Sequence, residues 1–91
     1  MDMQLANKRA FISGSTQGIG YSIAKALLRE GAAVVINGRD ASRVKQAVKD
    51  LEAEVPGGSV AGIAADFTEA THVQRLLDSL GGVDILVNNV G

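Results

Sequence analysis

Tyr21 and Lys25 are two residues whose types and spacing could do chemistry. They stand four positions apart in the segment YSIAK, so on a helix their side chains share one face. A tyrosine hydroxyl can act as a proton donor, and a neighbouring lysine can prepare it for that role by lowering its pKa. The alternative is an exposed helix face on which the two residues take no part in a reaction. The elements around the pair must decide between these interpretations.

A cluster of glycines comes directly before this pair. The segment SGSTQGIG places Gly14, Gly18 and Gly20 between an apolar run and a helical pattern. We expect Gly14 to let the chain turn sharply, and the other two to let the backbone approach a phosphate and the helix pack on the sheet. The helix N-terminus that follows offers N–H groups and a positive dipole end to an anion. The alternative is a tight turn that uses glycine for its geometry alone.

The spacing of the glycines distinguishes between known kinds of phosphate-binding loop. It reads G-x-x-x-G-x-G, whereas the commoner dinucleotide fingerprint reads G-x-G-x-x-G. A P-loop is excluded because the Lys-Ser/Thr that must follow the last glycine is missing. The position of the cluster, after a strand and before a helix, favours a dinucleotide site over a simple turn.

Apolar runs and helical patterns alternate along the whole chain. The runs at 9–13, 32–37, 59–65 and 83–89 are typical of strands in a parallel sheet that is covered on both faces. Between them, three apolar stripes have helical spacing, and Gly31 is the expected C-cap of the first helix. The order β-α-β-α-β-α-β predicts an α/β fold, a Rossmann-type doubly wound parallel sheet with strand order 3-2-1-4. A ligand is then expected at the carboxyl end of the first strand, where the glycines lie.

Composition excludes several classes of function. The chain has 91 residues, a net charge of −1 and no cysteine, which gives no support to a nucleic-acid partner, a membrane surface or a thiolate metal site. No signal peptide and no apolar run of about 20 residues is visible, so a cytoplasmic protein is expected. No group of His, Asp and Glu has metal-ligand spacing, and we expect no metal.

Three motifs together resemble the N-terminal half of a short-chain dehydrogenase/reductase. That family carries T-G-x-x-x-G-[IL]-G after its first strand, and here Ser13 replaces the threonine. It carries N-N-A-G after its fourth strand, where this chain has NNVG at 88–91, and an acidic residue after its third strand, where this chain has Asp66. The resemblance implies a nicotinamide cofactor. It also implies that these residues contact it: Gly14, Ser15, Thr16, Gly18, Ile19, Gly20, Arg39, Asp66, Phe67, Asn88, Val90 and Gly91.

The segment INGRD at the end of the second run bears on the choice of cofactor. Gly38 stands where NAD-preferring relatives place an aspartate, and Arg39 follows it. A guanidinium can pair bidentately with the 2′-phosphate of NADP, so we expect NADP, with NAD as the alternative. Asp40 is a rival ligand for the NAD ribose. We interpret it instead as a helix cap, because it falls past the strand.

The resemblance also bears on Tyr21 and Lys25. The family's catalytic Tyr-x-x-x-Lys lies well after the fourth strand, whereas Tyr21 opens the helix at the pyrophosphate end. We therefore expect Tyr21 and Lys25 on an outward helix face, and no catalytic residue within this stretch. Residues 1–91 are interpreted as the N-terminal part of a single dinucleotide-binding domain, truncated before the catalytic half.

The function implied for the full-length parent is transfer of hydride between NADP(H) and a carbonyl or alcohol substrate. A small-molecule substrate and a homo-oligomer are expected. The alternatives are a non-catalytic NAD(P)-binding sensor module and a relative that acts as an epimerase or dehydratase. A serine and a Tyr-x-x-x-Lys after Gly91 would support either enzyme, and their absence would support the sensor.

Overall fold

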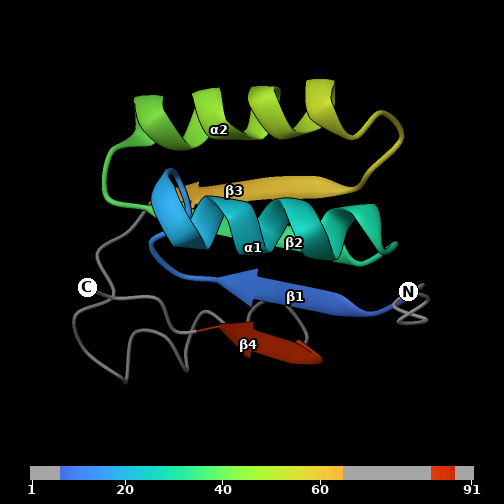
Figure 1. The fold of residues 1–91 in the computed structure, drawn as a ribbon. Helices are drawn as coiled ribbons and strands as arrows, with labels where there is room; N and C mark the ends of the chain where they lie inside the picture. Colours follow the sequence, from blue (N-terminus) through green and yellow to red (C-terminus); the bar gives the residue numbers. More distant parts are fainter. Residues whose placement is uncertain (1–6, 65–82, 88–91) are drawn as a thin grey trace.

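The described part of the molecule is a parallel sheet with two helices. The computed structural model describes residues 7–64 and 83–87. Its strands are β1 (Arg9–Ile12), β2 (Ala33–Gly38), β3 (Val60–Ala64) and β4 (Ile85–Val87). They pair in parallel in the order β3-β2-β1-β4 (Figure 1), which confirms the predicted order 3-2-1-4. The third predicted helix lies outside the described residues.

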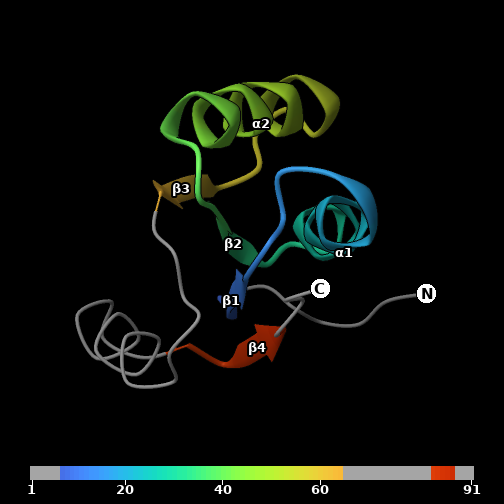
Figure 2. The same ribbon diagram turned by 90° about the vertical axis from the view of Figure 1, so that its left-hand side faces the viewer.

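Both described helices cover the same face of this sheet. The helix α1 (Gly18–Arg29) packs on β1 and β2, and α2 (Ala41–Glu54) packs on β2 and β3. Figure 2 shows the two helices side by side on this face. Right-handed crossovers place them there, because α1 joins β1 to β2 and α2 joins β2 to β3. Neither of these two helices is long and apolar enough to cross a membrane.

The core between the helices and the sheet is built from small and branched apolar side chains. Its buried members are Ala10, Ile12, Ala24, Leu28, Ala32, Val34, Ile36, Ala47 and Leu51. Phe11 and Val35 alternate to the other face of the sheet and are buried as well. The two central strands, β1 and β2, are therefore buried on both faces, as predicted. The same is not true of β3, whose residues are half-buried or exposed because β3 is an edge strand.

The helix ends follow from local sequence. At the end of α1, the Gly31 N–H donates to the Leu28 carbonyl and the Ala32 N–H to the Leu27 carbonyl, each over 3.1 Å. This pattern is a Schellman motif. The C-cap is Glu30, and Gly31, with φ 98°, is the left-handed residue directly after it, so the predicted C-cap was wrong by one position. At the start of α2, the Asp40 carboxylate accepts hydrogen bonds from two backbone N–H groups, so the cap is Asp40.

Candidate functional site

The glycine loop leaves β1 at its carboxyl end and leads directly into α1. Gly14 has φ 57° and Gly18 has φ 66°, both in the left-handed region that side chains disfavour. The sharp turn predicted for Gly14 is therefore confirmed. Gly18 opens α1 with the same backbone conformation, so the backbone geometry favours glycine at two of the three positions.

Ser15 fastens the loop to the end of β2. Its hydroxyl donates a 2.7 Å hydrogen bond to the Ile12 carbonyl and accepts a 2.9 Å bond from the Asn37 N–H. The Ser15 N–H donates in turn to the Asn37 carbonyl over 2.8 Å. Both residues are buried. These contacts give Ser15 a loop-positioning role, and the predicted contact with a cofactor stays a prediction.

Asn37 is a site residue that the sequence analysis missed. Its side-chain oxygen accepts a hydrogen bond from the Gly14 N–H over 3.3 Å, and its side-chain nitrogen donates to the Ile63 carbonyl over 3.1 Å. One buried amide thus joins the glycine loop to β3 across the end of β2. The signal in the sequence was a polar residue at the end of an otherwise apolar run, AAVVIN. Such a residue must find partners when it is buried.

Ser13 fastens the other side of the loop to β4. Its N–H donates a 3.0 Å hydrogen bond to the carbonyl of Val87, the last residue of β4. At the opposite end of these strands, the Arg9 N–H donates to the Asp84 carboxylate over 2.9 Å, and the Asp84 N–H donates to the Arg9 carbonyl over 2.8 Å. The glycine loop is therefore held by β2 on one side and β4 on the other.

The first turn of α1 has the features of an anion site. Its N-cap, Gln17, makes no side-chain hydrogen bond to the helix, and no acidic residue lies in the first turn. The N–H groups of this turn have no partner within the helix and carry the positive end of its dipole. Gly20 is buried against the sheet, whereas the Ile19 side chain is 74% exposed beside it. The start of α1 can therefore accept an anion, and the predicted contact of this loop with a pyrophosphate stays a prediction.

The end of β2 lies beside the loop. Gly38 is buried and Arg39 is exposed, while Thr16 lies half-buried against Gly38. The Asp40 carboxylate accepts hydrogen bonds from the N–H groups of Ser42 over 2.8 Å and Arg43 over 3.2 Å. Asp40 is thus engaged in capping α2, as the sequence analysis interpreted it.

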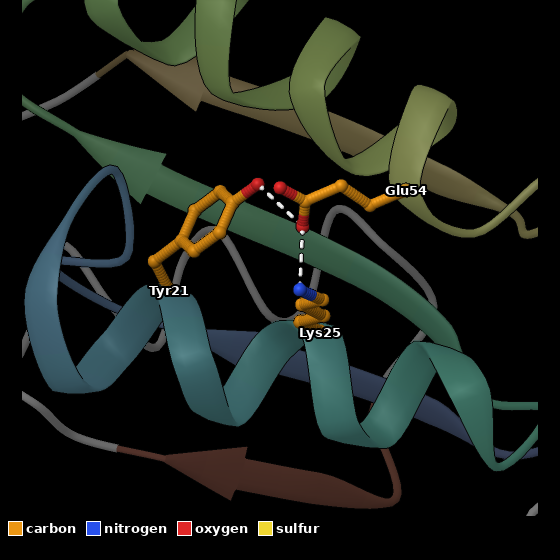
Figure 3. Close-up of polar contacts among 3 residues, drawn as sticks. All are labelled: Tyr21, Lys25 and Glu54. Atoms are coloured by element: carbon orange, nitrogen blue, oxygen red, sulfur yellow. Dashed lines mark hydrogen bonds and ion pairs between the residues drawn. The ribbon is translucent and has the colours of Figure 1, made fainter.

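Tyr21 and Lys25 both contact the same carboxylate oxygen of Glu54, the last residue of α2. The Tyr21 hydroxyl donates to Glu54 Oε2 over 3.1 Å, and Lys25 Nζ lies 3.0 Å from the same oxygen (Figure 3). The expectation of an outward face was therefore wrong in part, because both side chains are half-buried and lie toward α2. Removal from water raises the pKa of Tyr21 to about 12, and the hydrogen bond and charge of Glu54 add to this. A catalytic tyrosine needs the opposite shift.

Five predicted cofactor contacts lie outside the described residues and stay predictions: Asp66, Phe67, Asn88, Val90 and Gly91. Asn88 follows Val87, the last residue of β4, directly in sequence. Within 7–64 and 83–87, no three His, Asp or Glu side chains gather in a group that could hold a metal ion.

Comparison with known proteins decides the family. The family model described as short chain dehydrogenase matches residues 8–91. The chain belongs to the short-chain dehydrogenase family. The matched range includes the glycine loop at 14–20 and the NNVG segment at 88–91.

Individual short-chain dehydrogenases agree with this assignment. An uncharacterized oxidoreductase of Bacillus subtilis, YvrD, is 44% identical over 94 residues, covering all of this chain and 35% of YvrD. The crystal structure of L-sorbose reductase from Gluconobacter frateurii, complexed with NADPH and L-sorbose, has a TM-score of 0.85 at 38% identity. The match covers all of this chain and 36% of the reductase. The RhlG/NADP complex of Pseudomonas aeruginosa has a TM-score of 0.81 at 38% identity, with 96% and 36% covered. The chain thus spans about a third of the length of these relatives.

Proposed function

We propose that residues 1–91 are the N-terminal, NADP(H)-binding part of a longer short-chain oxidoreductase. The complete protein would transfer hydride between NADP(H) and the carbonyl or alcohol carbon of a small-molecule substrate. The observation that carries the proposal is the glycine loop, held between β2 and β4 at the start of α1, in a chain that matches the family over 8–91. The bound NADPH of the sorbose reductase and the NADP of RhlG support the same cofactor here.

The end of β2 supports NADP over NAD. An NAD-selective domain uses a carboxylate near this point to accept hydrogen bonds from the ribose hydroxyls. Here Gly38 offers no side chain, and Asp40 is engaged with the first turn of α2. Arg39 is exposed between them, and its guanidinium has the charge and the planar donors that suit a 2′-phosphate.

Each part of the site has a separate task in this proposal. The N–H groups of the first turn of α1 bind the pyrophosphate, and Arg39 binds the 2′-phosphate. Ser13, Ser15 and Asn37 hold the glycine loop in place. When bound, the nicotinamide supplies or takes up the hydride. The proton donor and the substrate pocket are assigned to residues after Gly91, since family relatives are about three times as long.

Removing the Arg39 guanidinium tests the cofactor assignment. In the complete protein, Arg39→Ala should weaken NADPH binding by about 10- to 150-fold, which corresponds to the loss of a charge-assisted hydrogen bond of about 1.5–3 kcal/mol. NADH binding should change far less, because NADH lacks the 2′-phosphate. Both affinities can be measured from the fluorescence of the reduced cofactor.

Arg29→Ala is the matched control, because Arg29 is exposed in the last turn of α1, about 16 Å along the helix from its N-terminus. It should alter neither affinity. An equal loss of NADPH and NADH binding in Arg39→Ala would contradict the assignment of Arg39 to the 2′-phosphate.

NADPH oxidation by the complete protein with a panel of ketones and aldehydes tests the reaction itself, and no turnover with any of them would favour a non-catalytic binding module.

We also propose, from the family, that the complete protein is a cytoplasmic homo-oligomer. Size-exclusion chromatography with light scattering would measure its oligomeric state directly. A monomer at micromolar concentration would contradict this part of the proposal.

A further inference from the structure

Residue 38 lacks a side chain for a steric reason. Its φ does not lie in the left-handed region, so the backbone itself would accept any residue. A Cβ built on Gly38, however, would lie 2.6 Å from Thr16 Cγ2 and 3.2 Å from Val44 Cγ2. Carbon atoms pack at about 3.5–4.0 Å, so the contact with Thr16 requires an atom to move. Glycine is present here because two neighbouring side chains occupy the space.

Thr16 is the main cause of this restriction. Its methyl group makes the shortest contact, whereas its hydroxyl oxygen would lie 3.5 Å from the same Cβ, an ordinary distance. Threonine is branched at Cβ and has few χ1 positions, so the methyl group cannot swing away freely. The glycine loop after β1 and the end of β2 are therefore coupled through one methyl group.

Residue 38 lies at the carboxyl end of β2, the region where an acidic residue reads the ribose of NAD. A carboxylate there would accept hydrogen bonds from the two ribose hydroxyls and would repel a 2′-phosphate. Any such side chain would have to start from the Cβ position that the Thr16 methyl group closes.

We propose that Thr16 is a specificity-determining residue that acts through Gly38. Its methyl group keeps residue 38 free of a side chain, and so keeps an NAD-selecting carboxylate out of the ribose site. This inference rests on the proposed function and adds a steric exclusion of NAD-type binding to the attraction supplied by Arg39. It follows that a substitution at residue 38 alone cannot change the cofactor preference from NADPH to NADH. Thr16 must be replaced as well.

The steric part can be measured without any nucleotide. Gly38→Ala is made in three backgrounds, which are the natural Thr16, Thr16→Ser and Thr16→Val, and the melting temperature of each is compared with that of its own Gly38 parent. Serine lacks the methyl group and keeps a hydroxyl, whereas valine keeps a methyl group at the crowded position. Gly38→Ala should lower the melting temperature by about 3 °C or more in the natural and the Thr16→Val backgrounds, the usual effect of overpacking, and by clearly less in the Thr16→Ser background. Equal shifts in the natural and the Thr16→Ser backgrounds would overturn the proposal.

The cofactor part compares Gly38→Asp with Gly38→Asp/Thr16→Ser in the complete protein. The double variant should bind NADH at least about tenfold more tightly than the single variant, because only in the double variant can the aspartate take its place. Both variants should bind NADPH less tightly than the natural protein. A single variant that binds NADH as tightly as the double variant would show that Thr16 exerts no control.

Failure of the proposed function would appear differently. If the natural protein bound neither cofactor, or preferred NADH, the proposed NADP binding would be wrong. The melting temperatures of the Gly38→Ala series involve no nucleotide, so they would still confirm or overturn the coupling of Thr16 to Gly38.

Discussion

The Tyr21 hydroxyl and the Glu54 carboxylate are joined by a 3.1 Å hydrogen bond that links the start of α1 to the end of α2 (Figure 3). Lys25 pairs with the same carboxylate oxygen. The lysine charge is therefore directed to Glu54, and the tyrosine keeps its proton more firmly than an isolated phenol, since its pKa is raised. A pair that looks catalytic in sequence thus serves to connect two helices.

Tyr21→Phe tests this assignment. We expect turnover of the complete protein to change by less than about twofold, because Tyr21 is assigned no part in proton transfer. Loss of a general acid would instead lower turnover by about 10²–10⁴-fold. The free energy of unfolding should fall by about 0.5–1 kcal/mol, the usual net value of a hydrogen bond. Steady-state kinetics and urea unfolding measure the two effects. The control is the tyrosine of any later Tyr-x-x-x-Lys, where activity should collapse, and a collapse at Tyr21 instead would refute the connecting role.

Acidification should weaken the same contact. Hydrogen bonding to Lys25 is the main cause that lowers the pKa of Glu54 below its usual value of 4.5. A carboxyl with a lowered pKa in the folded state stabilises the protein fully above its unfolded pKa, and this contribution is lost as the pH falls through the folded pKa. Between about pH 7 and about pH 3, the urea midpoint should therefore fall more in the natural protein than in Glu54→Gln. Glu52→Gln, an exposed carboxyl on the same helix, is the control. Equal acid sensitivity of the natural protein and Glu54→Gln would count against the contact.

Asn37 is expected to be costly to replace. Asn37→Ala removes two part-buried hydrogen bonds, to the Gly14 N–H and the Ile63 carbonyl. At about 0.5–1.5 kcal/mol for each bond, the free energy of unfolding should fall by about 1–3 kcal/mol. NADPH affinity should fall as well, because the glycine loop loses its link to β2. Gln46→Ala is the control, since it removes an exposed amide with a single hydrogen bond to Asp50. Urea unfolding and NADPH titration would measure both, and equal effects of the two substitutions would argue against a positioning role for Asn37.

The stability cost of a substitution at Gly18 should depend on the backbone preference of the new residue rather than on the size of its side chain. A Cβ at Gly18 would meet no atom within 4 Å, so only its φ of 66° opposes a side chain. Asparagine tolerates this conformation, whereas β-branched valine does not. Gly18→Val should lower the free energy of unfolding by about 1–2 kcal/mol and Gly18→Asn by clearly less, as measured by urea unfolding without nucleotide. Equal losses for the two variants would show that strain at this position is not the cause.

The order of elements was determined by the sequence itself, because local patterns carry it. Apolar runs that alternate with helical stripes predicted the parallel sheet and its order, and Asp40 and Gly31 marked helix ends through hydrogen bonds to nearby backbone. The left-handed turn at Gly14 was likewise local, since it depends on the residue's own backbone.

Contacts between residues far apart in the chain were decided only by the tertiary structure. No spacing rule links Tyr21 to Glu54, Asn37 to Gly14, or Thr16 to Gly38, because each pair is brought together by the packing of separate βα units. The half-burial of Tyr21 has the same origin, since a helical stripe shows which face is apolar and not which neighbouring helix lies beside it. The role of a polar side chain depends on the partner that tertiary packing supplies.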